Sequence, residues 1–285
     1  GGPLMDHVEI DLRAIERGTV TAPAGCGKTQ LIAHALAGHR GNKPILVLTH
    51  TNAGVAALRG RLDRASVPAS AYRLSTIDGW AIRLISTFPG RSAHDPEILR
   101  LVAPARDYPA IRDAAWKLLQ AGHVSEVLKA SYSHLIVDEY QDCSVPQHHI
   151  IYFLSLILPT AVLGDPMQAI FGFRGNALAD WNQQVCAHFP VVGELATPWR
   201  WRNVGAEALG QWLLEARRLL AAGQSVDLRS GPPEHVTWMQ ANPPNDHAQR
   251  LAAARTAPPT ADGRVLIIAD SRNRAAQQNF ASQTP

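Results

Sequence analysis

The segment from Thr19 to Thr29, TVTAPAGCGKT, restricts the possible folds of this 285-residue chain more than any other stretch. A β-branched run leads into a loop of small residues that ends in Gly-Lys-Thr, and residues 30–38 continue with helical spacing. Glycines let successive backbone N–H groups turn toward an anion, and the N-terminus of the following helix adds partial positive charge. The pattern is typical of a phosphate-binding loop, although Ala22 stands where the motif has its first glycine.

The loop carries side chains suited to both a phosphate group and a metal ion. The ammonium of Lys28 can reach the β- and γ-phosphates, and the hydroxyl of Thr29 can bind Mg²⁺. The residues expected to bind the phosphates are Ala24, Gly25, Cys26, Gly27, Lys28, Thr29 and Gln30. A strand–helix turn that ends in Gly-Lys-Thr by chance is the alternative, and the motifs that follow argue against it.

Two adjacent acids follow a second apolar run. Residues 133–137 (SHLIV) have the composition of a buried strand, and Asp138 and Glu139 come directly after it. One carboxylate at this point can hold Mg²⁺, usually through water, and the other can orient or deprotonate an attacking water. Adjacent acids also occur in capping turns, but the phosphate-binding loop upstream favours Asp138 as a metal ligand and Glu139 as the general base.

A third apolar run also ends in polar residues. Gln168 follows the run at 160–164 and is placed to hydrogen-bond a γ-phosphate or the attacking water. Phe171, Phe173 and Arg174 come next, in a Gly-rich turn. Aromatic rings interleaved with a guanidinium suit the stacking of single-stranded bases. Burial of both phenylalanines in the core is the alternative, and the Gly-rich turn favours the exposed role.

Polar residues also follow the apolar run at 44–49. His50, Thr51 and Asn52 come directly after it, at a position where open parallel sheets bind ligands. Capping of the next helix is an equally good interpretation for Thr51 and Asn52. Both possibilities remain open on the sequence alone.

Apolar runs alternate with segments of helical spacing along the chain. The predicted strands are residues 18–22, 44–49, 133–137, 160–164, 235–239 and 263–270. The predicted helices are residues 8–17, 30–38, 53–62, 96–129 with breaks at Pro104 and Pro109, 151–158, 204–220 and 246–254. This alternation predicts an α/β fold in which a parallel sheet has helices on both faces.

The same pattern predicts the domain organisation. Residues 1–88 and 130–222 are expected to form one α/β domain, with residues 89–129 as a small helical insertion. Residues 223–285 begin with a Pro-rich irregular stretch and then contain the apolar run at 263–270. They are expected to start a second α/β domain that is incomplete.

Composition excludes several classes of protein. The chain is 46% hydrophobic, but no apolar run reaches the roughly 18 residues of a membrane span, and the N-terminus lacks the features of a signal peptide. Cys26, Cys143 and Cys186 lack metal-binding spacing, which favours a reducing compartment and a cytoplasmic location. The net charge is +3 and most basic residues are arginine, which suits phosphate and base contacts or reflects genomic base composition. His148 and His149 are expected at the surface rather than in a metal site.

Taken in order, the motifs resemble those of the UvrD/Rep/PcrA group of superfamily 1 DNA helicases. The matching segments are Ala22–Thr29 (motif I), Leu48–Asn52 (Ia), Ser75–Trp80 (Ib), Val137–Asp142 (II), Gly164–Gly175 (III) and Leu195–Arg200. The strings VDEYQD and GDPMQAIFGFRG are the most specific of these. The resemblance covers about residues 8–275.

The resemblance implies a RecA-like P-loop NTPase domain that binds and hydrolyses MgATP. Within it, Gln168 would couple hydrolysis to movement and Arg200 would touch the γ-phosphate. The implied nucleotide and metal residues are Lys28, Thr29, Asp138, Glu139, Gln168 and Arg200. The implied single-strand contacts are His50, Thr51, Thr76, Phe171, Phe173 and Arg174.

The chain departs from the family pattern in several places. His50 stands where the family often has a base-stacking phenylalanine, and Pro198-Trp199 replaces the usual Asn-Tyr, which leaves Arg202 as an alternative to Arg200. An adenine-reading glutamine is not recognisable upstream of the loop, and the helical insertion is short. The later motifs of the second motor domain, with its arginine finger, do not occur in this sequence.

We therefore predict the N-terminal motor domain of a bacterial, phage or plasmid ATP-dependent helicase or translocase. It would move 3′ to 5′ on single-stranded or tailed duplex DNA, as a monomer that can also act with a protein partner. The alternative is a nucleotide-dependent DNA-binding or regulatory ATPase module that acts with a partner and does not unwind. A metabolic P-loop transferase is disfavoured because it has no need of the Phe-Arg turn. With one motor domain and the start of another, this chain alone is expected to show weak ATPase activity and no unwinding.

Overall fold

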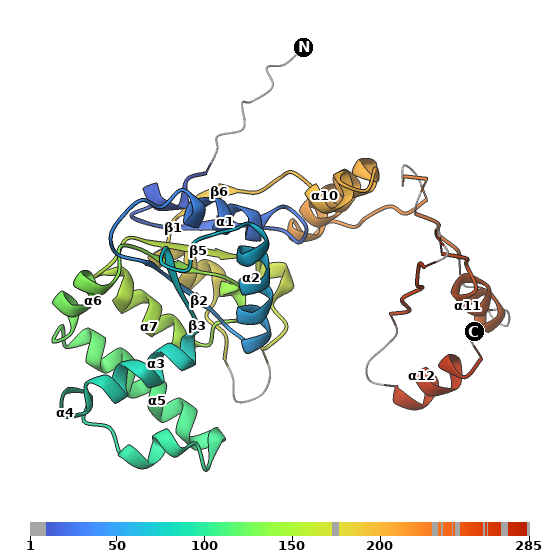
Figure 1. Ribbon diagram of the computed structural model, residues 1–285. Helices are drawn as coiled ribbons and strands as arrows, with labels where there is room; N and C mark the ends of the chain where they lie inside the picture. The colour runs from blue at the N-terminus through green and yellow to red at the C-terminus, as the bar shows by residue number, and fades with distance from the viewer. Residues whose placement is uncertain are drawn as a thin grey trace. The chain divides into compact units, whose positions relative to one another are not determined.

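The computed structural model describes residues 10–172, 177–229, 233–234, 236–240, 246–258, 262–268 and 273–283, with Asn242 and Thr260. The chain forms two compact units, residues 1–224 and residues 225–285. Each unit is described separately below, and Figure 1 shows the elements of both.

The first unit is built on a six-stranded sheet in the order β3-β2-β4-β5-β1-β6 (Figure 1). The strands are β1 (Arg17–Thr21), β2 (Ile45–Thr49), β3 (Tyr72–Thr76), β4 (Leu135–Val137), β5 (Thr160–Gly164) and β6 (Val191–Glu194). Every neighbouring pair is parallel. The predicted α/β fold with a parallel sheet is confirmed, and it is consistent with a RecA-like domain.

Helices cover both faces of the sheet, and the side chains of β2 alternate between two cores. Leu46 and Leu48 of β2 belong to a core with helices α3 (Ile77–Thr87), α5 (Pro104–Gln120) and α7 (Val145–Ser155). Ile45 and Val47 of the same strand belong to the opposite core, with α1 (Lys28–Ala37) and α2 (Asn52–Arg64). A strand buried on both faces reads as a continuous apolar run, which is why β2 was recognisable from sequence.

Further helices, several of them a single turn, complete the first unit. Between β3 and β4 lie α3, α4 (Pro89–Ser92), η2 (Pro96–Arg100), α5 and α6 (Ser125–Ser131). The remaining elements are η1 (Leu12–Ala14), η3 (Tyr140–Asp142), η4 (Pro166–Gln168), η5 (Trp181–Val185), α8 (Cys186–His188), α9 (Trp199–Arg202) and α10 (Glu207–Ala221).

Two helix predictions in this unit were wrong in detail. Pro109 does not interrupt α5, because Asp107 before it and Ile111 and Leu118 after it are buried and hold the helix in spite of the one backbone hydrogen bond that proline removes. The helix expected at 8–17 is reduced, within the described residues, to the single turn η1, because Arg17 already pairs in β1.

The second unit contains helices but no strand among its described residues. Helix α11 (Asp246–Ala254) confirms the predicted helix, and α12 (Arg274–Ala281) follows the apolar run. Residues 263–268 form no strand, and Leu266 and Ile268 are 84% and 88% exposed, so the buried strand predicted at 263–270 is wrong for these residues. Residues 236–239 are also not a strand. A strand needs a neighbour for its backbone groups, and the described part of this unit offers none.

The expectation that His148 lies at the surface was also wrong. His148 is fully buried in α7, and its Nδ1 and Nε2 atoms lie 2.8 Å from the Tyr140 hydroxyl and from Nδ1 of His188. Its ring stacks on that of His188, with centroids 5.1 Å apart. Burial lowers the pKa of His148 to about 4.

We predict that this histidine destabilises the fold in acid. Between the unfolded pKa of about 6.5 and the folded value of about 4, the unfolded chain binds the extra proton, so stability falls as the pH falls. A shift of that size corresponds to about 3 kcal/mol. Urea unfolding from pH 7 to pH 4 should show a shallower pH slope in His148→Gln than in the wild type. The exposed His123→Gln is the matched control, and an unchanged slope in His148→Gln would contradict the prediction.

Candidate active site

The loop between β1 and α1 has the shape of an anion cradle. Gly25 and Gly27 have φ angles of +78° and +92°, and α1 begins at Lys28 directly after them. A Cβ atom on Gly25 would lie 2.7 Å from the Trp201 ring, so both conformation and space require glycine there. Ala22, which replaces the first glycine of the motif, has no positive φ, and this explains why the substitution is tolerated.

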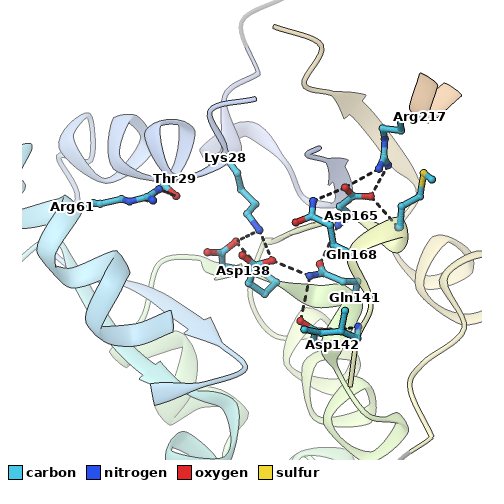
Figure 2. Close-up of polar contacts among 12 residues, drawn as sticks. Lys28, Thr29, Arg61, Asp138, Gln141, Asp142, Asp165, Gln168 and Arg217 are labelled. Atoms are coloured by element: carbon cyan, nitrogen blue, oxygen red, sulfur yellow. Dashed lines mark hydrogen bonds and ion pairs between the residues drawn. The ribbon is translucent and has the colours of Figure 1, made fainter. Parts of the chain in front are cut away.

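Lys28 connects the loop to the two acids that follow β4. Its Nζ atom lies 3.1 Å from Oδ1 of Asp138 and 2.6 Å from Oε2 of Glu139 (Figure 2). The side chains of Lys28 and Asp138 are only 14% and 11% exposed, so these contacts are poorly screened by solvent. The phosphate-loop lysine and both acids therefore occupy one site.

The protonation of the three groups follows from burial and from their mutual attraction. Burial alone would lower the pKa of Lys28, but Asp138 and Glu139 raise it above its usual value. Burial raises the pKa of Asp138 in spite of the nearby ammonium. Burial also acts to raise the pKa of Glu139, but Lys28 and a hydrogen bond from Gln141 lower it below its usual value. Glu139 is therefore held as a carboxylate, the form that a general base requires.

The backbone and a glutamine fix the carboxylate of Glu139. Glu139 has a φ of +54°, a left-handed conformation that is unusual for a residue with a side chain. Gln141 Nε2 donates to Glu139 Oε2 over 2.9 Å, and Gln141 Oε1 accepts from the backbone N–H of Asp165 at 3.0 Å. Gln141 thus links the end of β4 to the end of β5.

Gln168 lies just beyond β5 and is held by a buried carboxylate. Its Nε2 atom donates to Oδ2 of Asp165. Asp165 as a whole is only 1% exposed. Arg217 of α10 contacts both oxygens of the same carboxylate, at 2.8 and 2.5 Å (Figure 2). The glutamine is thereby presented next to the phosphate-binding loop rather than turned toward the protein surface.

Of the residues described above, Lys28, Glu139 and Gln168 line a cavity of about 800 Å³. Its walls include Ala24, Gly25, Gly27, Lys28, Thr29, Gln30, Arg61, Glu139, Gln168, Trp199, Arg200 and Asn203. Cys26 is buried behind the loop instead. Arg200 lies on the cavity wall and its backbone N–H donates to Gly25, whereas Arg202 pairs with Glu207. This geometry favours Arg200 over Arg202 as a phosphate contact.

The residues present suit a magnesium ion bound together with a nucleotide. Among the described residues, no group of three or more histidine, cysteine or acidic side chains could hold a metal on its own. Mg²⁺ usually keeps several waters and takes only one or two protein oxygens when phosphates supply the rest. The Thr29 hydroxyl and the Asp138 carboxylate are oxygen donors of the required kind, and Arg61 Nη1 donates to that hydroxyl over 2.6 Å.

The expected single-strand contacts lie beyond the ends of β2, β3 and β5. The ring of His50 is 5.1 Å from that of Phe171, with the planes inclined by 45°. The Thr51 and Thr76 hydroxyls accept backbone N–H groups at the starts of α2 and α3, so both threonines act as helix caps. Phe173 and Arg174 lie outside the described residues.

Five residues of the site were not predicted from sequence. Gln141 and Asp165 lie within the recognised motifs II and III, and Trp199 lies within the segment before α10. Arg61 and Arg217 lie on helices with no motif around them, so no sequence signal marked them. The first three could have been found by asking which polar or aromatic motif residues had no role assigned.

The motifs and the geometry agree with a comparison against known families. Residues 102–184 match the family model for the UvrD/REP helicase N-terminal domain. The chain carries a UvrD-like helicase domain. The matched part of this UvrD-like domain includes the two acids after β4 and Gln168, and the phosphate-binding loop precedes it. The comparison with curated proteins finds no match. None of the helices in the described part of the chain is long and apolar enough to span a membrane.

Proposed function

We propose that this UvrD-like domain binds and hydrolyses MgATP and couples hydrolysis to 3′-to-5′ movement on single-stranded DNA. The observation that carries the proposal is the position of Lys28, within 3.1 Å of both acids at the wall of the cavity. A phosphate-loop ammonium, a metal-ligand carboxylate and an ionised glutamate in one site are the parts that phosphoryl transfer to water requires.

In the proposed reaction, the backbone N–H groups of residues 24–29 and the Lys28 ammonium bind the β- and γ-phosphates. On nucleotide binding, Lys28 exchanges its contacts with the two carboxylates for contacts with phosphate oxygens. Thr29 and Asp138 would hold Mg²⁺, which would neutralise charge on the phosphate oxygens. Glu139 accepts a proton from the attacking water.

The coupling to DNA is assigned to the residues after β5. Gln168 would contact the γ-phosphate or the attacking water, and Phe171 follows it by three residues. A shift of Gln168 between nucleotide states would therefore move the Phe171–His50 ring pair, against which bases of a single strand would stack. Phe173, Arg174, Thr51 and Thr76 would extend this contact surface.

For the domain organisation, we propose that residues 1–88 and 130–222 form the motor domain, residues 89–129 a reduced insertion, and residues 223–285 the start of a second motor domain. Limited proteolysis that cuts near residue 224 and leaves residues 10–222 intact would support the division.

The proposed function is tested by MgATP binding and phosphate release, each with and without a single-stranded DNA oligonucleotide. Turnover that rises with DNA is the expected result. MgATP binding that alters DNA affinity without any turnover would favour the regulatory module instead. Absence of MgATP binding would overturn both proposals.

We predict that Trp199 stacks on the base of the nucleotide. Trp199 is 46% exposed, and its ring lies 3.0 Å from the position that a Cβ atom on Gly27 would occupy. Both residues lie at the cavity wall. Trp199→Ala should weaken ATP binding by about 5- to 10-fold, the size of an aromatic stacking interaction, with turnover at saturation nearly unchanged. Trp199→Phe should bind nearly as the wild type does. Equal affinity of Trp199→Ala for ATP and for inorganic triphosphate, measured by competition, is expected; a retained preference for ATP would contradict the stacking role.

A further inference from the structure

We propose that Arg217 of helix α10 is a positioning residue for ATP hydrolysis: it fixes the carboxylate of Asp165, and through that carboxylate it orients Gln168. The inference rests on the proposed function, since it names a further residue for the same reaction. Neither a motif nor the spacing of the sequence marks this arginine, which is 52 residues away from its partner.

The contact has the geometry of a fixed pair rather than of a surface ion pair. Arg217 Nη1 lies 2.8 Å from Oδ2 of Asp165, and Nη2 lies 2.5 Å from Oδ1. The side chains are 19% and 2% exposed. A planar guanidinium that contacts both oxygens of a buried carboxylate sets the carboxylate's rotation as well as its charge. Figure 2 shows this pair beside Gln168 and Gln141.

The carboxylate of Asp165 holds two other groups in place. Its Oδ2 atom accepts from Gln168 Nε2, and its Oδ1 atom accepts from the backbone N–H of Met167 in η4. The backbone N–H of Asp165 donates to Gln141, whose amide donates to Glu139. A continuous series of hydrogen bonds therefore runs from α10 to the proposed general base (Figure 2).

Removal of the guanidinium would leave a buried carboxylate without its charged partner. Such a group either takes up a proton or turns toward water, because a buried unpaired charge is costly. Both responses change the acceptor that Gln168 uses. The Gln168 amide would then sample several orientations at the cavity wall, and the population competent for hydrolysis would fall without loss of the phosphate-binding loop.

The location of Arg217 on α10 suggests that its contact with Asp165 responds to movement of that helix. Ala216 beside it is buried, and α10 contacts α9 of the same unit. Helix α10 ends at Ala221, three residues before the end of the first unit. A displacement of α10 would therefore act on Asp165 and Gln168 through the Arg217–Asp165 ion pair.

The test compares Arg217→Met with Arg218→Met in the full chain. Arg218 is the matched control because it neighbours Arg217 on α10 but pairs with Glu215 and is 67% exposed. Arg217→Met should lower kcat about 10-fold and change the KM for ATP less than about 2-fold, the pattern of an interaction used in the transition state. Hydrogen exchange at the amides of Asp165 and Met167, measured without nucleotide, should be about 10-fold faster as those contacts loosen. Arg218→Met should change neither readout.

Each deviation has a defined meaning. Faster exchange with unchanged kcat would show that Arg217 is merely structural and would overturn the proposal, as would reduced kcat with unchanged exchange. If the wild type binds no MgATP, the proposed function fails, whereas the exchange readout still decides whether Arg217 fixes Asp165. Should Arg217→Met not fold, Arg217→Lys is the second variant. It keeps the positive charge but cannot contact both carboxylate oxygens as the planar guanidinium does, so kcat and amide exchange should change in the same directions by smaller factors.

Discussion

Glu139→Gln should abolish most ATP turnover while MgATP binding persists. Glutamine has nearly the same shape but cannot accept the proton of the attacking water, and the loss of a general base costs about 10²- to 10⁴-fold in rate. The lowered pKa of Glu139, which Lys28 and Gln141 maintain against burial, keeps the wild-type side chain ionised at neutral pH. Phosphate release at saturating single-stranded DNA and ATP measures the effect.

Glu126→Gln provides the control for Glu139→Gln. Its side chain is 87% exposed and pairs with Lys129 on α6, so its substitution should leave turnover unchanged. Binding of a fluorescent ATP analogue should be within about 3-fold of the wild type in Glu139→Gln, because the phosphate-binding groups remain. Turnover by Glu139→Gln at a rate similar to that of the wild type would exclude Glu139 as the base and redirect attention to Asp138.

Lys28→Met should cost both binding and turnover. Methionine keeps the length of the side chain but removes the ammonium that contacts Asp138 and Glu139 and that would contact the phosphates. Charge-assisted contacts of this kind contribute about 1.5–3 kcal/mol each, so MgATP affinity should fall by about 100-fold. The variant also leaves two adjacent carboxylates without their cation, which should raise the pKa of Glu139 and impair it as a base at neutral pH.

A second lysine isolates the contribution of position 28. Lys117→Met removes an ammonium that is 58% exposed and pairs with Asp113 along α5, far from the phosphate-binding loop in sequence. MgATP affinity measured by titration should be unchanged in this control. Wild-type affinity in Lys28→Met would mean that the loop does not bind phosphate in the way proposed here.

Local sequence patterns were enough to predict the parts of the fold that depend on neighbours along the chain. The continuous apolar run of β2 and the small residues before Lys28 report burial and turn geometry directly, and both were predicted correctly. The acids after β4 were assigned to the same site because they follow an apolar run downstream of the loop, and Lys28 contacts both of them.

The features that sequence reasoning missed depend on contacts between distant segments. An apolar run such as residues 263–268 specifies a strand only if a partner strand is available, and the pattern itself contains no information about the partner. His148 looked like a surface residue until its neighbours Tyr140 and His188 were known. Arg217 is one of two adjacent arginines on an amphipathic helix, and only tertiary packing selects it for Asp165.

The strand order has a consequence for the width of the reaction site. Strand β5 separates β1, which carries the phosphate-binding loop, from β4, which carries the acids. With neighbouring strands about 4.8 Å apart, the loop and the acids stand roughly 10 Å from each other across β5. That separation leaves room for a terminal phosphate and a water in line between them, and the long Lys28 side chain spans it. In the proposed reaction Gln168, four residues beyond the end of the middle strand β5, would contact groups on both sides of this gap.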